Sequence, residues 1–506
     1  MSSPDVDDSE IVFFAPRPTK RAKLASAAVP KQPAAPSVVK PSSQTSSQAA
    51  DTAEHKESPA EDGPAIVVSS GGDTSTSAAA AATAEELLTD FKSLGISGWL
   101  CSICQSLGMT KPTAVQRGCI PAVLAGKDVI GLAQTGSGKT AAFALPILQI
   151  LAKDPYGVFA LVLTPTRELA IQISEQFHAL GAGMNLKELV VIGGMDITTQ
   201  SKALARRPHV VLATPGRLKG LLDSDYTSVA PIFKNVKFLV LDEADRLLEP
   251  SFEEELRVIL GALPEERQTL LFSATMTQSL IRLQHAALDD AHVFQEYEGL
   301  KTASQLREQY VFLPSKVKEV YLHHLLTHLT EGKVRSVIIF TSTCKGCHLL
   351  SLLLEELGLR CASLHSGKSQ KQRLSALSQF KSEQVPLLLA TDVASRGLDI
   401  PTVDLVVNYD LPMLARDYVH RVGRTARAGR AGWALSFVTQ YDIQLVHKIE
   451  ELVGHKLGQY EMAETEVLAG ITKVYSSKRA AMLRIAEEDG LDTKKNRNIK
   501  KAAKGL

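Results

Sequence analysis

The chain of 506 residues exceeds what one hydrophobic core usually covers, so we expect two or three folded units. Its composition, 44% hydrophobic and 22% charged, is ordinary for a soluble globular protein, and no apolar run approaches the ~18 residues that cross a bilayer, which argues against a membrane role. A net charge of +1 does not by itself indicate nucleic acid, and six cysteines in this length indicate a reducing compartment rather than a disulfide framework.

Residues 1–85 are rich in Ala, Ser, Pro and Thr and show no periodicity suited to packing, so we predict a disordered N-terminal region. The first residues, MSSPDVDDSE, lack the basic start and apolar stretch of a secretory signal. The segment PTKRAKL gathers Lys20, Arg21 and Lys23 after a proline. Such a cluster fits a nuclear import signal and also arises by chance, and the sequence leaves both interpretations open.

From Leu87 onward, short apolar runs alternate with longer amphipathic stretches of helical period. Nearly continuous hydrophobicity in the runs is typical of strands buried on both faces, as in a parallel sheet covered by helices. The runs of the first half are DVIGLA from Asp128, FALVLTP from Phe159, ELVVIGG from Glu188, HVVLATP from His209, FLVLDEAD from Phe238 and TLLFSAT from Thr269.

The series then restarts, with SVIIFTS from Ser336, CASLHS from Cys361, PLLLATD from Pro386, LVVNYD from Leu405 and ALSFVT from Ala434. We therefore predict two α/β domains, over residues 86–298 and 305–465, with the split near residues 296–306. In most runs, polar residues or glycines stand at the C-terminal end of the strand. That edge is where open α/β sheets bind their ligands.

The segment AQTGSGKT follows one predicted strand and opens a helix, which is the context that a phosphate-binding loop requires. Its glycines allow backbone N–H groups to turn inward around phosphate oxygens, Lys139 can reach the β and γ phosphates, and Thr140 can hold Mg²⁺. Ala133 stands where the general pattern has a glycine. The predicted nucleotide-binding residues of this loop are Ala133, Gln134, Thr135, Gly136, Ser137, Gly138, Lys139 and Thr140.

The segment LDEAD, from Leu241 to Asp245, ends another predicted strand and places adjacent carboxylates at the same sheet edge. We predict that Asp242 binds Mg²⁺ through water and that Glu243 orients and deprotonates the attacking water. Acidic pairs are also common on solvated loops. The phosphate loop upstream favours the catalytic interpretation.

These motifs and their order resemble those of the DEAD-box RNA helicases of superfamily 2, and the resemblance covers roughly Asp90 to Thr465. It implies two tandem RecA-like domains and the cofactors ATP and Mg²⁺. Phe91 and the segment GMTKPTAVQ, which ends at Gln116, resemble the family's adenine-reading segment. A glutamine amide can pair with a donor and an acceptor on adenine, and an aromatic ring can cover the base.

Further motifs at the end of the first domain and in the second domain extend the resemblance. The SAT segment of Ser273, Ala274 and Thr275 resembles the family segment that couples hydrolysis to domain closure, a role that the resemblance extends to His420. In HRVGRTARAG, Arg424 and Arg427 match the arginine-finger positions, which implies that hydrolysis requires the second domain. Asp399, in SRGLDIP, matches a residue that touches the ATP ribose. Ala426 stands where many members have glycine.

The resemblance also implies a track of RNA-contacting residues. Hydroxyls, helix N-termini, backbone amides and a few arginines suit phosphate and 2′-OH contacts and read few bases, so we expect weak sequence preference. For each residue alone, a capping or turn role is an equally good account, and only the set favours RNA. The track comprises Pro165, Thr166, Arg167, Gly193, Gly194, Thr214, Pro215, Gly216, Arg217, Thr341, Gly367, Gln370, Arg373 and Thr391.

Two cysteine pairs have spacings found at metal or haem sites. Cys101 and Cys104 form one CxxC, and CKGCH, from Cys344 to His348, matches the c-type haem attachment pattern. Both pairs lie in predicted helices of different domains, without a second haem ligand motif or a zinc-ribbon context. We interpret the cysteines of the two pairs as buried or half-buried helix residues, and Cys119 and Cys361 as core residues.

The C-terminal segment, residues 466–506, is basic. From Ile471 onward its acidic residues are Glu487, Glu488, Asp489 and Asp492, and its basic residues are Lys473, Lys478, Arg479, Arg484, Lys494, Lys495, Arg497, Lys500, Lys501 and Lys504. Such a tail can hold phosphates without reading sequence, or it can simply be a solvated end.

The motif set predicts an RNA-dependent ATPase that separates short duplexes or remodels ribonucleoprotein, with an ATP-gated RNA clamp as the alternative and a DNA helicase as a weaker rival. The runs GGMDITTQ, FLVLDEADRLLEPSFEEEL, RQTLLFSATMT and KVYSSKRAAMLRIAEEDG are similar to those of nucleolar members that process small-subunit pre-rRNA. This closer resemblance implies 18S pre-rRNA processing in the nucleus and nucleolus. It also implies a stimulatory protein cofactor and a monomer within a larger ribonucleoprotein.

Overall fold

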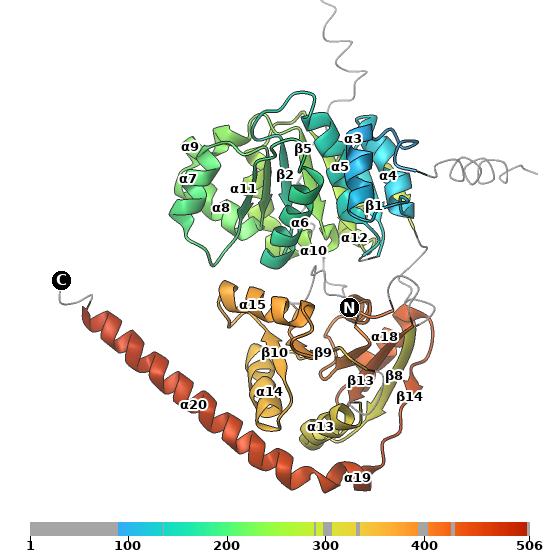
Figure 1. Cartoon of the computed structure of the whole chain (residues 1–506), viewed down its shortest axis with the longest axis vertical. Helices are drawn as coiled ribbons and strands as arrows, with labels where there is room; N and C mark the ends of the chain where they lie inside the picture. The colour runs from blue at the N-terminus through green and yellow to red at the C-terminus, as the bar shows by residue number, and fades with distance from the viewer. Residues whose placement is uncertain are drawn as a thin grey trace, which may run out of the picture. The chain divides into compact units, whose positions relative to one another are not determined.

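The apolar runs of each half of the chain form the strands of one parallel sheet, as the sequence predicts, in a computed structural model of the protein (Figure 1). The structure describes residues 90–134, 136–287, 290–296, 306–329, 334–392, 403–426 and 431–502, with the side chains of 286–287 and 488–502 left out. The predictions of disorder over residues 1–85 and of an import signal at Lys20, Arg21 and Lys23 lie outside these ranges.

The first sheet has seven strands in the order β3-β4-β2-β5-β6-β1-β7, all paired in parallel. Six of them match the predicted runs, and β7 was not predicted. The strands are β1 (Val129–Leu132), β2 (Ala160–Leu163), β3 (Glu188–Val191), β4 (Val210–Ala213), β5 (Phe238–Asp242), β6 (Gln268–Ser273) and β7 (His292–Gln295).

Alternate residues of these strands enter two hydrophobic layers, because successive side chains of a strand point to opposite faces. Val129 belongs to one layer and Ile130 to the other. The first layer is covered by α3 (Gly98–Ser106), α4 (Ala114–Leu124), α5 (Lys139–Leu151) and α6 (Arg167–Leu180). The second is covered by α7 (Ile197–Ala205), α8 (Pro215–Ser224), α9 (Tyr226–Val229), α10 (Ala244–Leu247), α11 (Glu253–Gly261) and α12 (Gln278–Ala287).

The second sheet repeats this plan with the strand order β10-β11-β9-β12-β13-β8-β14, again all parallel. Five strands match the predicted runs, while β8 and β14 were not predicted. The strands are β8 (Leu306–Phe312), β9 (Val337–Phe340), β10 (Cys361–Leu364), β11 (Leu387–Ala390), β12 (Leu405–Asn408), β13 (Gly432–Val438) and β14 (Gly458–Gln459). The predicted pair of α/β domains with parallel sheets is confirmed.

Helices cover both faces of the second sheet as well. Ile339 faces a layer with α13 (Lys318–Leu329), α14 (Cys344–Glu356), α19 (Glu464–Ala469) and α20 (Ile471–Ala502). Ile338 faces the opposite layer, which contains α15 (Gln370–Lys381), and Ala434 packs in a third cluster with α17 (Ala415–Val422) and α18 (Ile443–Val453).

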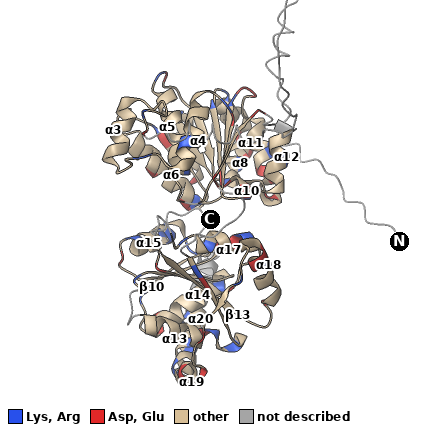
Figure 2. Ribbon diagram, turned by 90° about the vertical axis from the view of Figure 1, so that its right-hand side faces the viewer, with Lys and Arg blue, Asp and Glu red and all other residues tan. Residues whose placement is uncertain are grey.

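The basic C-terminal segment begins as part of the folded second domain. Val467, Val474 and Ala481, spaced seven residues apart, are buried in the layer of α13 and α14. Lys478 pairs with Glu319 of α13, and Arg484 lies 2.9 Å from a carboxylate oxygen of Glu356 at the end of α14. Figures 1 and 2 both show α20 beside α14. The first half of this segment is therefore a packed helix, and its charges are partly used in ion pairs.

Candidate active site

The phosphate loop joins β1 to α5 at the carboxyl edge of the first sheet. Gly136 and Gly138 adopt left-handed backbone conformations, with φ of 85° and 94°, which glycine tolerates without a side-chain clash. Lys139 begins α5 and is buried, and its Nζ donates to the carbonyl oxygens of Ala133 (2.6 Å) and Gln134 (2.9 Å). Burial lowers the pKa of Lys139, and the nearby Asp242 opposes that effect. Thr135 lies outside the described residues.

Gln116 ties the preceding segment to this loop. Its Oε1 accepts from the backbone N–H of Thr113 (2.9 Å), and its Nε2 donates to the carbonyl oxygen of Gly138 (3.1 Å). A Cβ at Gly138 would lie 2.4 Å from that same Nε2, so the contact requires glycine there. Phe91 is buried in the hydrophobic core. Adenine contacts of Gln116 and Phe91 stay predictions.

The acidic segment ends β5 beside Lys139. Asp242 is 4% exposed, and burial raises its pKa to about 7 although Lys139 opposes the rise. The carboxylate therefore lacks enough compensating positive charge among the described residues, which fits a site for a divalent cation with Thr140 of α5. Glu243 has φ 53° and ψ 51°, a left-handed conformation that costs a non-glycine residue about 1–3 kcal/mol. Burial also raises the pKa of Glu243.

A chain of hydrogen bonds runs from the phosphate loop to the SAT segment and on to the acidic segment. The N–H of Ala133 donates to the carbonyl of Ser273 (3.0 Å), and Ser273 Oγ donates to the carbonyl of Thr275 (2.8 Å). Thr275 Oγ1 in turn donates to Asp245 Oδ2 (3.0 Å). Ala274 contributes only backbone between the two hydroxyls. The SAT segment thus joins the phosphate loop to Asp245.

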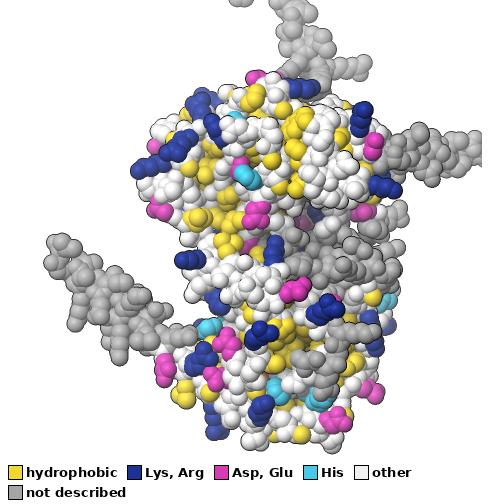
Figure 3. Space-filling view, in the orientation of Figure 1, with side chains coloured by type: hydrophobic (Ala, Val, Ile, Leu, Met, Phe, Trp, Pro, Cys, Tyr) yellow, Lys and Arg dark blue, Asp and Glu magenta, His cyan; other side chains and the backbone are white. Residues whose placement is uncertain are grey.

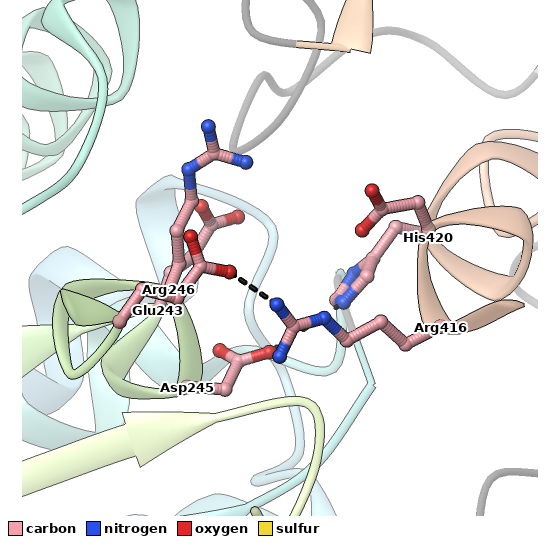
Figure 4. A pocket seen from close by; sticks show the side chains of 7 residues that line it. Glu243, Asp245, Arg246, Arg416 and His420 are labelled. Atoms are coloured by element: carbon pink, nitrogen blue, oxygen red, sulfur yellow. Dashed lines mark hydrogen bonds and ion pairs between the residues drawn. The ribbon is translucent and has the colours of Figure 1, made fainter. Parts of the chain in front are cut away.

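Asp245 meets the second domain at His420, with 3.6 Å between the carboxylate oxygen and Nε2 (Figure 4). Burial alone would raise the pKa of Asp245, but its interaction with His420 and the hydroxyls of Ser273 and Thr275 lower it to about 2. Burial works against protonation of His420, yet Asp245 raises its pKa. Each side chain therefore shifts the pKa of the other toward its charged form, as expected for an ion pair.

A pocket surrounds this contact, and Figure 4 shows its lining side chains. Arg416 of α17 forms an ion pair with Glu249, which follows α10. Arg424 is 2% exposed and its Nε donates to the carbonyl of His420 (3.3 Å), while its charge lowers the pKa of Glu243 against the effect of burial. The lining residues are Glu243, Asp245, Arg246, Glu249, Arg416, Asp417 and His420. Arg427 and Asp399, both predicted to contact ATP, lie outside the described residues.

The predicted RNA residues of the first domain gather at the ends of β2, β3 and β4. Thr166 and Thr214 occupy the N-cap positions of α6 and α8, and Pro165 precedes the first of them. Added Cβ atoms at Gly193 and Gly194 would lie 2.9 and 2.7 Å from the guanidinium of Arg167, so that side chain lies against the glycine pair. Pro215, Gly216 and Arg217 form the first turn of α8.

In the second domain, two predicted RNA residues bind a carboxylate of the first. Gln370 Nε2 donates to Glu168 Oε1 (2.7 Å), and Arg373 Nη2 donates to Glu168 Oε2 (2.8 Å). Glu168 is 2% exposed. Sequence analysis missed the roles of Glu168, Glu249 and Arg416. A role for Glu168 could have been predicted from its place in the PTRELA motif. No local feature of the sequence distinguishes Glu249 or Arg416 from other surface charges.

The cysteines lie as the sequence predicts. Cys101 and Cys104 are in α3, Cys344 and Cys347 are in α14, and Cys104, Cys119 and Cys347 are buried. Cys361, in β10, packs at the edge of the core. Among the residues that the structure describes, no cluster of three or more His, Cys, Asp or Glu could hold a metal ion.

On one face of the molecule, charge does not mark an RNA surface. On the face drawn in Figure 3, Lys and Arg side chains are interspersed with Asp and Glu. Within the described ranges, no helix is both long and apolar enough to cross a membrane.

Comparison with known proteins identifies two family regions. Residues 113–283 match the DEAD/DEAH box helicase family, and residues 318–429 match the helicase conserved C-terminal domain. The chain is 55% identical over 422 residues to DEAD-box ATP-dependent RNA helicase 36 of Arabidopsis thaliana, covering 83% of this chain and 86% of that protein. It is 50% identical over 418 residues to the probable ATP-dependent RNA helicase DDX49 of Homo sapiens, covering 82% and 86%. Among solved structures, S. cerevisiae Dbp5 bound to RNA and ADP BeF3 matches with a TM-score of 0.67 at 27% identity, over 76% of this chain and 99% of that one.

Proposed function

Because the chain belongs to the DEAD-box family of ATP-dependent RNA helicases and is thus an RNA-dependent ATPase, we propose that it remodels precursor ribosomal RNA during 18S processing and small-subunit assembly. The support is the closer likeness of four sequence runs, GGMDITTQ among them, to nucleolar members of the family. This function assigns the protein to the nucleus and nucleolus, as a monomer within a larger ribonucleoprotein, with a protein cofactor that stimulates it. Absence of a tagged chain from nucleoli would contradict the assignment.

In the proposed mechanism, the phosphate loop and Lys139 hold the phosphates of ATP. Thr140 and Asp242, the latter through water, would hold Mg²⁺, which would supply positive charge against the transferred phosphoryl group. Glu243 orients the attacking water and takes its proton. Burial raises the pKa of Glu243, which makes its carboxylate a stronger base toward that water. Arg424 and Arg427 supply positive charge from the second domain, which a finger arginine can convert into a rate gain of roughly 10³–10⁵.

The observation that carries the proposed mechanism is the connected path from Ala133 through Ser273, Thr275 and Asp245 to His420. In this mechanism, a change at the ATP phosphates alters the position of the phosphate loop. The position of the Asp245 carboxylate, which pairs with His420 of the second domain, then depends on that loop. ATP state and domain closure are therefore coupled through hydrogen bonds of ordinary length and the ion pair of Asp245 with His420. RNA bound to both domains would be remodelled as they close and released as they open.

The first test is ATP hydrolysis by purified protein with and without single-stranded RNA. The chain should show RNA-stimulated turnover, and Lys139→Ala and Glu243→Gln should each reduce it about 10²–10⁴-fold. Lys153→Ala, at an exposed lysine after α5, is the matched control and should leave turnover unchanged. Turnover of Glu243→Gln equal to that of the unaltered chain would refute the assigned base.

An ATP-gated RNA clamp is the second candidate, and one observation favours it. The buried contact of Glu168 with Gln370 and Arg373 joins the domains without using any residue of the hydrolysis site. A closed, RNA-holding state could therefore persist without turnover. Complementation of cells that depend on the chain distinguishes the two functions. Rescue of 18S maturation by Glu243→Gln supports the clamp, and failure of rescue supports remodelling driven by hydrolysis.

A further inference from the structure

Three parallel strands of the second sheet end at the same level, and polar residues follow each of them. Leu364 of β10 pairs with Ala390 of β11, which pairs with Phe340 of β9. The next residues along the chain are His365, Thr391 and Thr341, which therefore form a row across the carboxyl edge of the sheet. Resemblance to the family predicts RNA contacts for the two threonines but assigns nothing to His365.

His365 is a buried histidine whose ring lacks a hydrogen-bonding partner among the residues that the structure describes. The residue is 5% exposed, and neither Nδ1 nor Nε2 bonds to any group of those residues. Thr391 Oγ1, beside it in the row, is also buried and unsatisfied. An unmade hydrogen bond at a buried polar atom costs about 1–3 kcal/mol. A row of such atoms indicates that these groups are satisfied by a ligand.

The surroundings of His365 keep its ring neutral. Burial lowers its pKa to about 4, and the positive charges of Lys368 and Arg373 add to that effect. The ring of His348 lies 5.7 Å away, centroid to centroid, and a Cβ at Gly367 would come within 3.1 Å of Nδ1, so the backbone at Gly367 packs against the ring. Phosphate, which offers only acceptors and favours cations, suits Lys368 and Arg373 better than it suits this imidazole.

A neutral imidazole presents one N–H donor and one nitrogen acceptor. The ribose 2′-hydroxyl is likewise both a donor and an acceptor, and it is the group that distinguishes RNA from DNA. We propose that His365 binds a ribose 2′-hydroxyl of the RNA strand and contributes to the choice of RNA over DNA. This inference rests on the proposed RNA-contacting role of this sheet edge, but not on any role in ribosome assembly.

The test is the affinity of the full chain, with Mg²⁺ and a non-hydrolysable ATP analogue, for a labelled ten-nucleotide oligo(U) and its all-2′-deoxy counterpart. His365→Phe keeps the size and ring but removes both nitrogens. It should weaken RNA binding about 3–10-fold, the worth of a neutral hydrogen bond, and leave DNA binding unchanged. His365→Asn, which restores a donor and an acceptor, should recover part of the loss. His348→Phe, the matched control at the neighbouring ring, should keep the RNA-to-DNA ratio.

A scan of single 2′-deoxy substitutions along the RNA locates the contact. At one position, the loss caused by the deoxy sugar should vanish in His365→Phe, because both changes remove the same hydrogen bond. A purely structural histidine predicts instead that His365→Phe weakens RNA and DNA by the same factor. That result, or an unchanged RNA-to-DNA ratio in His365→Phe, would overturn the proposal. Failure of pre-rRNA maturation in cells would bear on the proposed function alone.

Discussion

Ala426 adopts a left-handed backbone conformation, with φ of 54°, at a buried position within the arginine-finger motif. This conformation costs an L-residue about 1–2 kcal/mol. Ala426→Gly removes that cost but gives the unfolded chain extra freedom worth about 0.4–1 kcal/mol. The net expectation is a stabilisation of about 0.5–1 kcal/mol, or a rise in Tm of about 1–4 °C for a domain of this size.

Fluorescence of Trp433 can follow the second domain alone. The chain has two tryptophans, Trp99 in the first domain and Trp433 in β13, so Trp99→Phe leaves a single reporter. In that background, Ala426→Gly should raise Tm. Ala480→Gly makes the same chemical change within the right-handed helix α20, where glycine costs about 1 kcal/mol, and should lower it. Equal signs for the two variants would refute the reasoning from backbone strain.

Three further expectations follow from the ionisable groups and from α20. The pKa of His420 is raised above its ordinary value of 6.5, and the pKa of Asp245 is lowered from its ordinary value of 3.8 to about 2. Their ion pair therefore contributes its full stabilisation between pH 3.8 and 6.5. The contribution is lost as pH rises through the folded pKa of His420 or falls toward 2. RNA affinity with an ATP analogue should therefore decline as pH rises above 6.5, and His420→Gln should flatten that decline. Iodoacetamide near neutral pH should alkylate Cys344 well before Cys119. A hydrogen bond with Ser366 is the main cause of the lowered pKa of Cys344, whereas burial raises the pKa of Cys119 to about 12. Equal alkylation rates by mass spectrometry would contradict this expectation. Val474→Ala should cost the second domain about 1–3 kcal/mol in the Trp433 assay, whereas a solvated tail predicts no change.

Sequence reasoning found the strands whose hydrophobicity is continuous and missed those whose burial depends on distant partners. In β8, Glu308 is buried because Tyr418 donates to it (2.8 Å) and His455 lies 3.2 Å away, both more than a hundred residues along the chain. The local sequence LREQYVF gives no indication of these partners. Its polar residues therefore do not predict a buried strand. In α20, the seven-residue apolar spacing is present in the sequence but is obscured by the surrounding lysines and arginines.

The contacts of the candidate site also include some that the sequence predicts and some that it does not. Motif order predicted which residues would meet at the sheet edges, because parallel strands bring their carboxyl ends together. It did not predict that Gln370 and Arg373 would both bind Glu168, since this contact depends on how side chains of two domains fit rather than on any local pattern. Nor could it show that Gln116 would use its amide on the backbone of Gly138.

The resting state of Lys139 bears on how ATP is acquired. Its ammonium already donates to two carbonyls of its own loop, and hydrogen bonds to a charged group are worth about 1.5–3 kcal/mol. An arriving nucleotide must take the lysine from these carbonyls, so the loop competes with its own ligand and weakens apparent affinity roughly 10–100-fold. Part of the attraction between Lys139 and the phosphates is thus spent on freeing the lysine, and a departing nucleotide is replaced at once by the loop's own carbonyls.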